Sequence, residues 1–179
     1  MISVKSKAGY ADTCSVDPSA FRDAMARFPT GVAIVTTHDE DGTPYGFTAS
    51  SFCSVSLDPP LVLVCLARSA RSCPVFGRNR NFAISILQST HVEFARRFAS
   101  KIPDRFAAGG FVHTPRGSIV LDEALVVVEC SVDSRHEAGD HVIMVGEVDQ
   151  VSLAEQGKPA VYFDRGFRTL CSTSCRPQA

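Results

Sequence analysis

The apolar and polar positions of the chain follow strand patterns over most of its length. Val32 to Thr37 is rich in β-branched residues, and Tyr45 to Ser50 can return beside it after the turn signal Asp39-Glu40-Asp41-Gly42. This arrangement predicts an antiparallel hairpin. Leu61 to Ala67 is continuously apolar, as expected of a strand covered on both faces, and Phe82 to Leu87 resembles it. We therefore expect these last two segments in the core.

The segment Phe52 to Leu57 alternates instead. Cys53, Val55 and Leu57 fall on one face, and serines separate them. Pro59 and the proline after it cannot donate to a ladder, so pairing should stop there. The pattern predicts a half-buried strand.

Strand patterns return in the C-terminal half of the chain. A glycine turn at Gly139 separates the first two of these strands. The predicted strands are Ala124 to Val132, His141 to Val151, Ala160 to Phe163, and Phe167 to Leu170.

A short amphipathic helix is predicted near the N-terminus. Asp17 followed by Pro18 is an N-cap with proline at the first helical position. Phe21, Met25 and Phe28 then share one face. The sequence therefore predicts a helix that ends before Pro29 and Gly31.

Two further helical starts follow. Thr90 and Glu93 have the spacing of a capping box ahead of the apolar positions Val92, Phe94, Ala95, Phe98 and Ala99, which predicts a second short helix. Cys73-Pro74 is a proline-containing start of a third.

These elements predict a mainly β fold, with at least seven strands and two or three short helices. Strands and helices do not alternate, so an antiparallel barrel or sandwich is favoured over a parallel doubly wound sheet. We expect one domain over residues 17–170, with flexible polar tails at 1–16 and 171–179.

Composition and charge narrow the function classes. The chain has 179 residues, 45% of them hydrophobic, and a formal net charge of -1. This net charge does not indicate the basic surface that proteins use to bind nucleic acid or an anionic membrane. No apolar run approaches the roughly 20 residues of a membrane-spanning helix. We therefore expect a cytoplasmic protein that binds neither nucleic acid nor membrane.

The seven cysteines do not form a metal-binding pattern. There is no Cys-x-x-Cys pair, and the closest spacing, Cys171 to Cys175, has no histidine nearby. Cys53, Cys65 and Cys130 lie inside strand-like runs and are expected to be buried free thiols. We predict no metal site.

A dinucleotide would have to bind without the usual glycine-rich loop. Neither G-x-G-x-x-G nor G-x-x-x-x-G-K-[ST] occurs. The segment Gly46 to Phe52 instead has small hydroxyl residues flanked by aromatic ones. Small side chains let a planar ligand approach the backbone and bond its N–H and C=O groups. The alternative interpretation is a serine-rich strand exit.

Two further segments could contact such a ligand. Ala67-Arg68-Ser69-Ala70-Arg71-Ser72 precedes a helical start and could hold a phosphate, or it could be a solvated turn with two arginines. Gly139-Asp140-His141 is a glycine turn that leads into a strand. His141 could contact a ligand at the mouth of a barrel, or serve only the structure.

Four separated segments together resemble the short-chain flavin reductase family, the reductase components of two-component flavin-dependent monooxygenases. They are Phe28-Pro29-Thr30-Gly31-Val32, the GFTASSFCSVSLDPP stretch from Gly46 to Pro60, Gly139-Asp140-His141, and Tyr162-Phe163 with Phe167 and Arg168. The resemblance runs from about Phe21 to Leu170. It implies a split β-barrel of the FMN-binding type that forms a homodimer. It also implies that FAD or FMN is reduced by NADH, with NADPH as an alternative, and passes to a monooxygenase partner.

The resemblance also assigns site residues. Those that look like the flavin-ring contacts are Thr48, Ala49, Ser50 and Ser51, with Pro29 and Thr30 nearby, and the flanking strand Cys65, Leu66 and Ala67. Ser69, Arg71 and Ser72 look like the phosphate turn, and Arg97 and Phe98 would lie near the adenylate end of FAD. Gly139, Asp140 and His141, with Arg168, look like the nicotinamide side. His141 is the expected catalytic residue, as a group that positions the nicotinamide rather than donating a proton.

Two rival functions remain. An oxidase of the pyridoxamine-phosphate type would need a basic cluster for its substrate phosphate, and the arginines are scattered along the sequence. A flavin-binding protein without turnover is the other.

Overall fold

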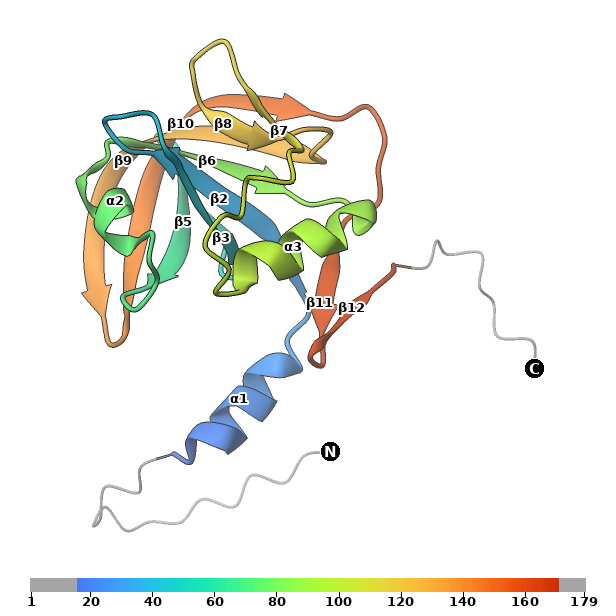
Figure 1. Ribbon diagram of the computed structural model, residues 1–179. Coiled ribbons are helices and arrows are strands. Elements are labelled where there is room, and N and C mark those ends of the chain that lie inside the picture. The colour runs from blue at the N-terminus through green and yellow to red at the C-terminus, as the bar shows by residue number, and fades with distance from the viewer. Residues whose placement is uncertain (1–15, 171–179) are drawn as a thin grey trace.

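The structure, a computed structural model, describes residues 16–170 as a β-rich body with few helices (Figure 1). Its largest sheet has seven antiparallel strands. In spatial order they are β3 (Pro44–Ala49), β2 (Ala33–His38), β6 (Asn81–Ile86), β9 (Val126–Ala138), β10 (His141–Leu153), β5 (Pro60–Ala67) and β4 (Cys53–Leu57). The predicted antiparallel, mainly β class is confirmed.

Two small sheets and the helices complete the described part. One sheet joins β1 (Thr30–Gly31), β11 (Val161–Phe163) and β12 (Gly166–Arg168), and the other joins β7 (Phe111–His113) and β8 (Ile119–Leu121). The helices are α1 (Pro18–Ala26), α2 (Cys73–Arg78) and α3 (Val92–Ala99), with a 3-10 turn at Ser89–His91. Among the described helices, none is long and apolar enough to cross a membrane.

Strand β2 carries the core because both of its faces are buried. Val35 packs with Phe47, Phe76 and Ile84 in one apolar cluster. Its neighbour Ile34 points the other way, into a second cluster that includes Leu87, Phe98 and Leu121. The apolar run that predicted this strand is thus explained by a sheet covered on both sides at this point.

The curl of the large sheet brings its two halves together. The end of β3 contacts β5, although four other strands lie between them in the order of the sheet. The backbone N–H of Cys65 donates to Ser51 Oγ at 2.9 Å. Strand β4 pairs with β5 only as far as Leu63, so the Cys65 N–H has no strand partner on that side and the Ser51 hydroxyl takes the place of one. We call this contact the Ser51–Cys65 clip.

Helix α1 forms as predicted but stands apart from the body (Figure 1). Asp17 caps it by accepting from Ala20 N at 3.0 Å, which lowers the pKa of Asp17 through its bonds to Ser19 and Ala20. An ion pair between Arg165 and Asp23 fastens the helix to the turn after β11. Phe21 is 56% exposed, and no residue of the helix is buried.

The prediction of a half-buried strand at Phe52 to Leu57 is wrong in its burial. β4 forms, but it is the edge strand of the sheet, and Cys53, Val55 and Leu57 are exposed. β5 was expected to be covered on both faces, yet burial alternates: Val64 is fully buried and Leu63 only partly. The cause is position, because this end of the sheet has nothing packed on its outer face in the described chain.

Three smaller expectations also need correction. The capping box before α3 joins Gln88 and His91 rather than Thr90 and Glu93. The strands β7 and β8 were not predicted, and the Gly109-Gly110 turn precedes β7 with positive φ at both glycines. Residues 1–15 and 171–179, where flexible tails were predicted, lie outside the described residues.

The buried-thiol prediction holds for one cysteine of three. Cys130 is buried, and burial raises the pKa of its thiol to about 12. Cys65 is half-buried and Cys53 is exposed. The four cysteines of the described residues, including Cys73, are free thiols.

Gly146→Ala should destabilise the fold. A Cβ at Gly146 would lie 2.5 Å from Phe82 Cζ and 2.9 Å from Cys130 Cβ, and both neighbours are buried and cannot yield. We expect a loss of about 1–3 kcal/mol in the free energy of unfolding, measured by urea denaturation. Gly77→Ala is the control, because a Cβ there meets nothing within 4 Å and alanine favours its helix. Equal stability of the two variants would refute this packing account.

Ser51→Ala should loosen the curl of the sheet. The substitution leaves the Cys65 N–H without its acceptor, which costs about 1–3 kcal/mol. Thermal unfolding of this variant is compared with that of Ser54→Ala, since the Ser54 hydroxyl is exposed on β4. If both variants melt at the wild-type temperature, the clip does not stabilise the fold.

Candidate functional site

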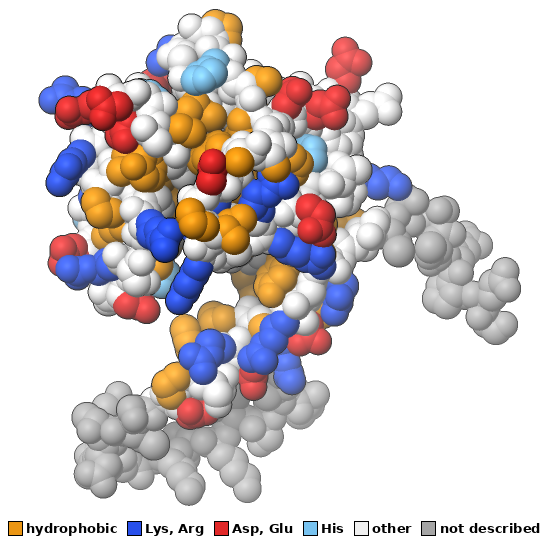
Figure 2. Space-filling view, in the orientation of Figure 1, with side chains coloured by type: hydrophobic (Ala, Val, Ile, Leu, Met, Phe, Trp, Pro, Cys, Tyr) orange, Lys and Arg blue, Asp and Glu red, His pale blue; other side chains and the backbone are white. Residues whose placement is uncertain are grey.

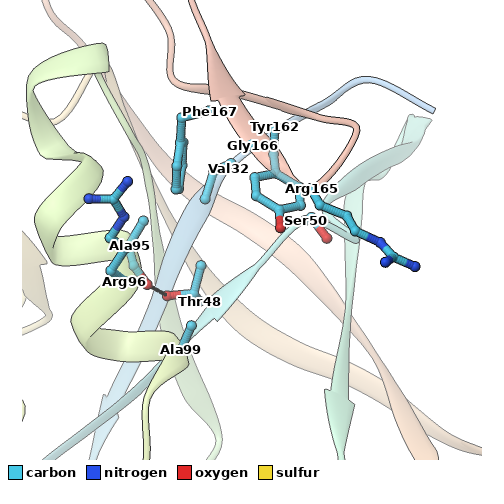
Figure 3. A pocket seen from close by; sticks show the side chains of 10 residues that line it. All are labelled: Val32, Thr48, Ser50, Ala95, Arg96, Ala99, Tyr162, Arg165, Gly166 and Phe167. Atoms are coloured by element: carbon cyan, nitrogen blue, oxygen red, sulfur yellow. Dashed lines mark hydrogen bonds between the residues drawn. The ribbon is translucent and has the colours of Figure 1, made fainter. Parts of the chain in front are cut away.

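Two open pockets meet at the end of β3. The first, which we call the β5 pocket, has a volume of about 510 Å³ and is lined from β3, β5, the turn after β5, the end of α3 and the start of β10. The second, the α3 pocket, has a volume of about 400 Å³ and lies between α3, β3 and the β11–β12 hairpin (Figure 3). Thr48 and Ala99 line both, so the two pockets are neighbours.

Thr48 is held at this junction by its side chain. Its Oγ1 donates to Ala95 O at 2.7 Å, which ties β3 to α3 (Figure 3). Across the β5 pocket, the Ser51–Cys65 clip fixes the distance between β3 and β5. The small side chains Thr48, Cys65 and Ala67 therefore face a shared space whose walls are fastened on both sides.

The turn after β5 and the turn before β10 form one rim of the β5 pocket. His141 pairs with Ala67 across the ladder, and Arg68 N donates to Asp140 O at 2.9 Å. Two segments about 70 positions apart in the sequence are thereby placed side by side. The glycine at 139 has φ of 60°, a conformation that glycine adopts without strain.

Asp140 orients the imidazole of His141. Asp140 Oδ1 lies 2.7 Å from His141 Nδ1, and this hydrogen bond, with the charge of the histidine, holds the pKa of Asp140 below its usual value. Because Nδ1 is engaged, Nε2 is left for a ligand in the β5 pocket, which His141 lines. This arrangement suits a group that positions a ligand.

The lining of the β5 pocket also includes cations. Arg71, Lys101 and Arg105 all line it. Arg105 Nη1 donates to Gly46 O at 2.8 Å and Nη2 donates to Ser100 O, so its guanidinium is fixed. Burial, and then the nearby charge of Arg71, lower the pKa of Arg105. Three cations in one open pocket favour an anionic ligand.

A flavin nucleotide fits these residues. The small walls at Thr48, Cys65 and Ala67 admit a flat ring, and the cations suit a phosphate. Ser72, at the end of the turn, is buried, and its hydroxyl has no hydrogen-bond partner among the described residues. Ser72 does not itself line the β5 pocket, and its hydroxyl is open to a hydrogen bond with water or with a ligand.

The α3 pocket has aromatic and cationic walls. The rings of Tyr162 and Phe167 are 5.3 Å apart and packed edge to face. The guanidinium of Arg96 lies 5.8 Å from the centre of the Phe167 ring, and Arg165 lines the same pocket. Figure 3 shows the rings of Tyr162 and Phe167 opposite α3, which carries Arg96, while the Arg165 side chain extends away from the rings. This chemistry suits a second planar, anionic nucleotide.

The structure gathers most of the predicted site residues. Thr48, Cys65, Leu66, Ala67, Ser69, Arg71, Phe98 and His141 line the β5 pocket, and Thr48 and Ser50 line the α3 pocket. Thr30 and Ser50 line a groove beside α1. Gly139 and Asp140 form the adjoining turn, and Ser51 supports the wall through its clip.

Of the predicted residues that line neither pocket, four are also not part of a turn, contact or groove that adjoins one: Pro29, Ala49, Arg97 and Arg168. Ala49 is buried in the core and Pro29 is exposed ahead of β1. The guanidinium of Arg97 lies 5.0 Å from the Phe94 ring centre, and Arg168 lies against Gly166 on β12. Arg168 is therefore separate from His141 in the described chain, although both were assigned to the nicotinamide side.

Sequence reasoning missed Lys101 and Arg105. They follow α3 in a proline-containing loop and are four residues apart. This spacing of two cations was the only signal in the sequence for a role in binding. The arginines that look scattered in the sequence are thus joined in space by Lys101 into a basic cluster. The premise that the chain offers no such cluster is wrong.

Comparisons with known proteins identify the family of this chain. The family model described as flavin reductase like domain matches residues 25–171. The actinorhodin polyketide dimerase of Streptomyces coelicolor is 57% identical over 89% of this chain and 90% of its own length. The flavin-dependent monooxygenase reductase subunit HsaB of Rhodococcus jostii is 37% identical over 83% of this chain and 76% of its own.

A solved structure extends the likeness to the fold. The NADH:FAD oxidoreductase SgcE6 of Streptomyces globisporus, in complex with NAD and FAD fragments, superimposes with a TM-score of 0.83 at 32% identity. The match covers 88% of this chain and 95% of that one. With a family match over most of the chain, close relatives and the shared fold, this protein belongs to the flavin reductase like domain family.

Proposed function

We propose that this flavin reductase binds FAD or FMN in the β5 pocket and reduces it with NADH. The observation that carries the proposal is the composition of one pocket. Its lining combines small side chains with the cations Arg71, Lys101 and Arg105 and with His141. The chemistry that bound flavin supplies is acceptance of a hydride from the nicotinamide.

The residues of the chain bind and orient. Thr48, Cys65 and Ala67 leave room for the ring, and Arg71 and Lys101 offset the negative charge of the phosphate. His141, held by Asp140, donates or accepts a hydrogen bond at the carboxamide of NADH and so sets the orientation of its ring. Tyr162 and Phe167 in the neighbouring pocket provide faces for the rest of the dinucleotide.

Reduced flavin passes to a separate monooxygenase in this proposal. Ser69 and Arg71 are exposed at the mouth of the β5 pocket, so the flavin has a way out. HsaB, the Rhodococcus relative, is itself a reductase subunit of a flavin-dependent monooxygenase. We place this exchange in the cytoplasm, where NADH is available.

A second candidate comes from the relative named a polyketide dimerase, which is 57% identical. On that basis a polyketide is a candidate substrate of the partner oxygenase, or of this chain directly. The two are separated by adding the polyketide with NADH and flavin but no oxygenase. Product formation would favour direct action.

The central experiment follows NADH oxidation by the purified chain with added FAD or FMN. Turnover with at least one flavin is expected. Binding of flavin without any NADH oxidation would leave only the non-catalytic alternative.

His141→Ala should raise the KM for NADH by about tenfold, since one hydrogen bond of roughly 1.4 kcal/mol is lost. The affinity for flavin, measured by fluorescence quenching without NADH, should stay within about twofold of the wild type. His136→Ala is the control, because His136 is exposed on β9 and bonds only Ser134. Unchanged steady-state kinetics in His141→Ala would remove this residue from the nicotinamide side.

We also propose that the chain forms a homodimer through α1. The side chains of Phe21, Met25 and Phe28 are 56%, 54% and 70% exposed. Such exposure is unusual for three large apolar side chains on one short segment. Figure 2 shows hydrophobic side chains along this projecting segment. A second copy that covers them would remove this apolar area from water.

Charging the exposed face of α1 should therefore dissociate the dimer. Phe21→Asp with Met25→Asp is expected to halve the mass measured by sedimentation at micromolar concentration. Val112→Asp, which charges an exposed apolar residue on β7, should keep the wild-type mass. A wild-type chain that sediments as a monomer would overturn the proposal.

A further inference from the structure

The turn between β11 and β12 has an arginine where a glycine would be expected. Phe163 pairs with Gly166, so Asp164 and Arg165 are the two residues of the turn, and their φ angles are 47° and 59°. A two-residue hairpin turn with positive φ at both positions usually has glycine at the second, because a side chain there is strained. Strain that is kept in a fold points to a role for the side chain that causes it.

The side chain of Arg165 leads to α1. Its guanidinium forms an ion pair with Asp23, and Figure 3 shows it extending away from the rings of Tyr162 and Phe167. Beside it, Asp164 N donates to Ala26 O at 2.6 Å. The last carbonyls of a helix have no partner within the helix, so this bond satisfies one of them. The turn is thus joined to α1 by a charged contact and by a backbone contact.

These contacts hold one wall of the α3 pocket. β11 and β12 belong to the small sheet with β1, in which β12 is an edge strand. Tyr162 and Phe167 lie opposite each other on this hairpin and form the aromatic part of the wall. A groove of about 720 Å³ runs along α1 and is also lined by Tyr162 and Arg165. The hairpin therefore has open space on both sides, and its contacts with α1 help to fix its position.

We propose that Arg165 is a positioning residue for NADH. Paired with Asp23, it fastens the β11–β12 hairpin to α1 and so keeps Tyr162 and Phe167 where the dinucleotide packs on them. The inference rests on the proposed function, because it takes part of NADH to lie in the α3 pocket. It goes further by giving α1, through Asp23, a part in NADH binding.

Direct binding of a phosphate of NADH is the competing role for Arg165, since this residue lines the α3 pocket. Two observations favour positioning. The guanidinium is already engaged by a carboxylate, and it is directed away from the aromatic rings. Arg96, whose guanidinium lies 5.8 Å from the centre of the Phe167 ring, is the cation beside those rings.

Arg165→Gly separates positioning from a merely structural role. Glycine adopts the turn without strain, so the variant should melt at or above the wild-type temperature. It loses the ion pair, whose two side chains are 61% and 59% exposed. We expect the KM for NADH to rise about two- to fivefold, as for the loss of an exposed ion pair, with kcat unchanged. The dissociation constant of the flavin, measured by fluorescence without NADH, should stay at the wild-type value.

Asp23→Asn separates positioning from direct binding. The variant keeps α1 but frees the guanidinium of Arg165. Positioning predicts a rise in the KM for NADH similar to that of Arg165→Gly, whereas direct binding predicts a fall, because the cation would be released for the phosphate. The double variant should be no worse than either single variant, since both remove the same contact.

Arg116→Ala is the matched control. It removes another partly exposed ion pair, between Arg116 and Asp149, in the turn between β7 and β8, and Arg116 lines neither the α3 pocket nor the β5 pocket. Its kinetics should be those of the wild type. Sedimentation of Asp23→Asn should give the wild-type mass, because Asp23 is two positions from both Phe21 and Met25 and so lies off their face of the helix.

An unchanged or lower KM for NADH in Asp23→Asn would overturn the inference, as would additive effects of the two substitutions. So would a change in mass that accompanies the change in KM, because the effect would then belong to the dimer. In each of these cases continued oxidation of NADH with added flavin leaves the proposed function intact. A wild-type chain that oxidises no NADH with either flavin would instead overturn the proposed function.

Discussion

The site depends on one hydrogen bond that closes the curl of the large sheet. β4 stops pairing with β5 at Leu63, and the Cys65 N–H beyond that point donates to the Ser51 hydroxyl. Because Ser51 follows β3 directly, the bond brings the small residues of β3 against those of β5. β3 and β5 are not neighbours in the sheet, so no strand ladder joins them at this point. Ser51 is therefore a positioning residue, and its hydroxyl is engaged with the wall.

The same curl explains why chemically different segments share one pocket. The ladder between β5 and β10 places His141 opposite Ala67, and the Arg68 to Asp140 bond locks the two turns together. Arg105 reaches the pocket from the far side and is fixed there by Gly46 O. The positive charge of Arg105 is repelled by the other cations of the pocket, and these backbone contacts hold Arg105 in place against that repulsion. Preorganised charge of this kind binds an anion without paying to assemble the site.

Local patterns were enough to predict the hairpin of β2 and β3, the capped start of α1 and the turn at Gly139, because residues close in sequence decide them. The small-residue segment from Thr48 to Ser51 was also recognised, since its composition is unusual for a strand. The order of strands was beyond such reasoning. β4 looked half-buried from its alternation, but burial depends on which strand lies at the edge, and long-range pairing decides that. Lys101 and Arg105 were missed because only the fold brings their loop to the turn after β5.

Two of the surfaces where apolar residues stay exposed have one explanation under the proposed dimer. Cys53 pairs with Leu63, Leu63 with Val145 and Cys65 with Ile143, so these side chains share the outer face of the sheet. That face runs into the β5 pocket at Cys65 and Ala67. Helix α1 is a second exposed apolar element, and none of its residues is buried. If a second copy covers these surfaces, the dimer interface and the flavin site both include residues of β5. Loss of the dimer would then weaken flavin binding as well as stability.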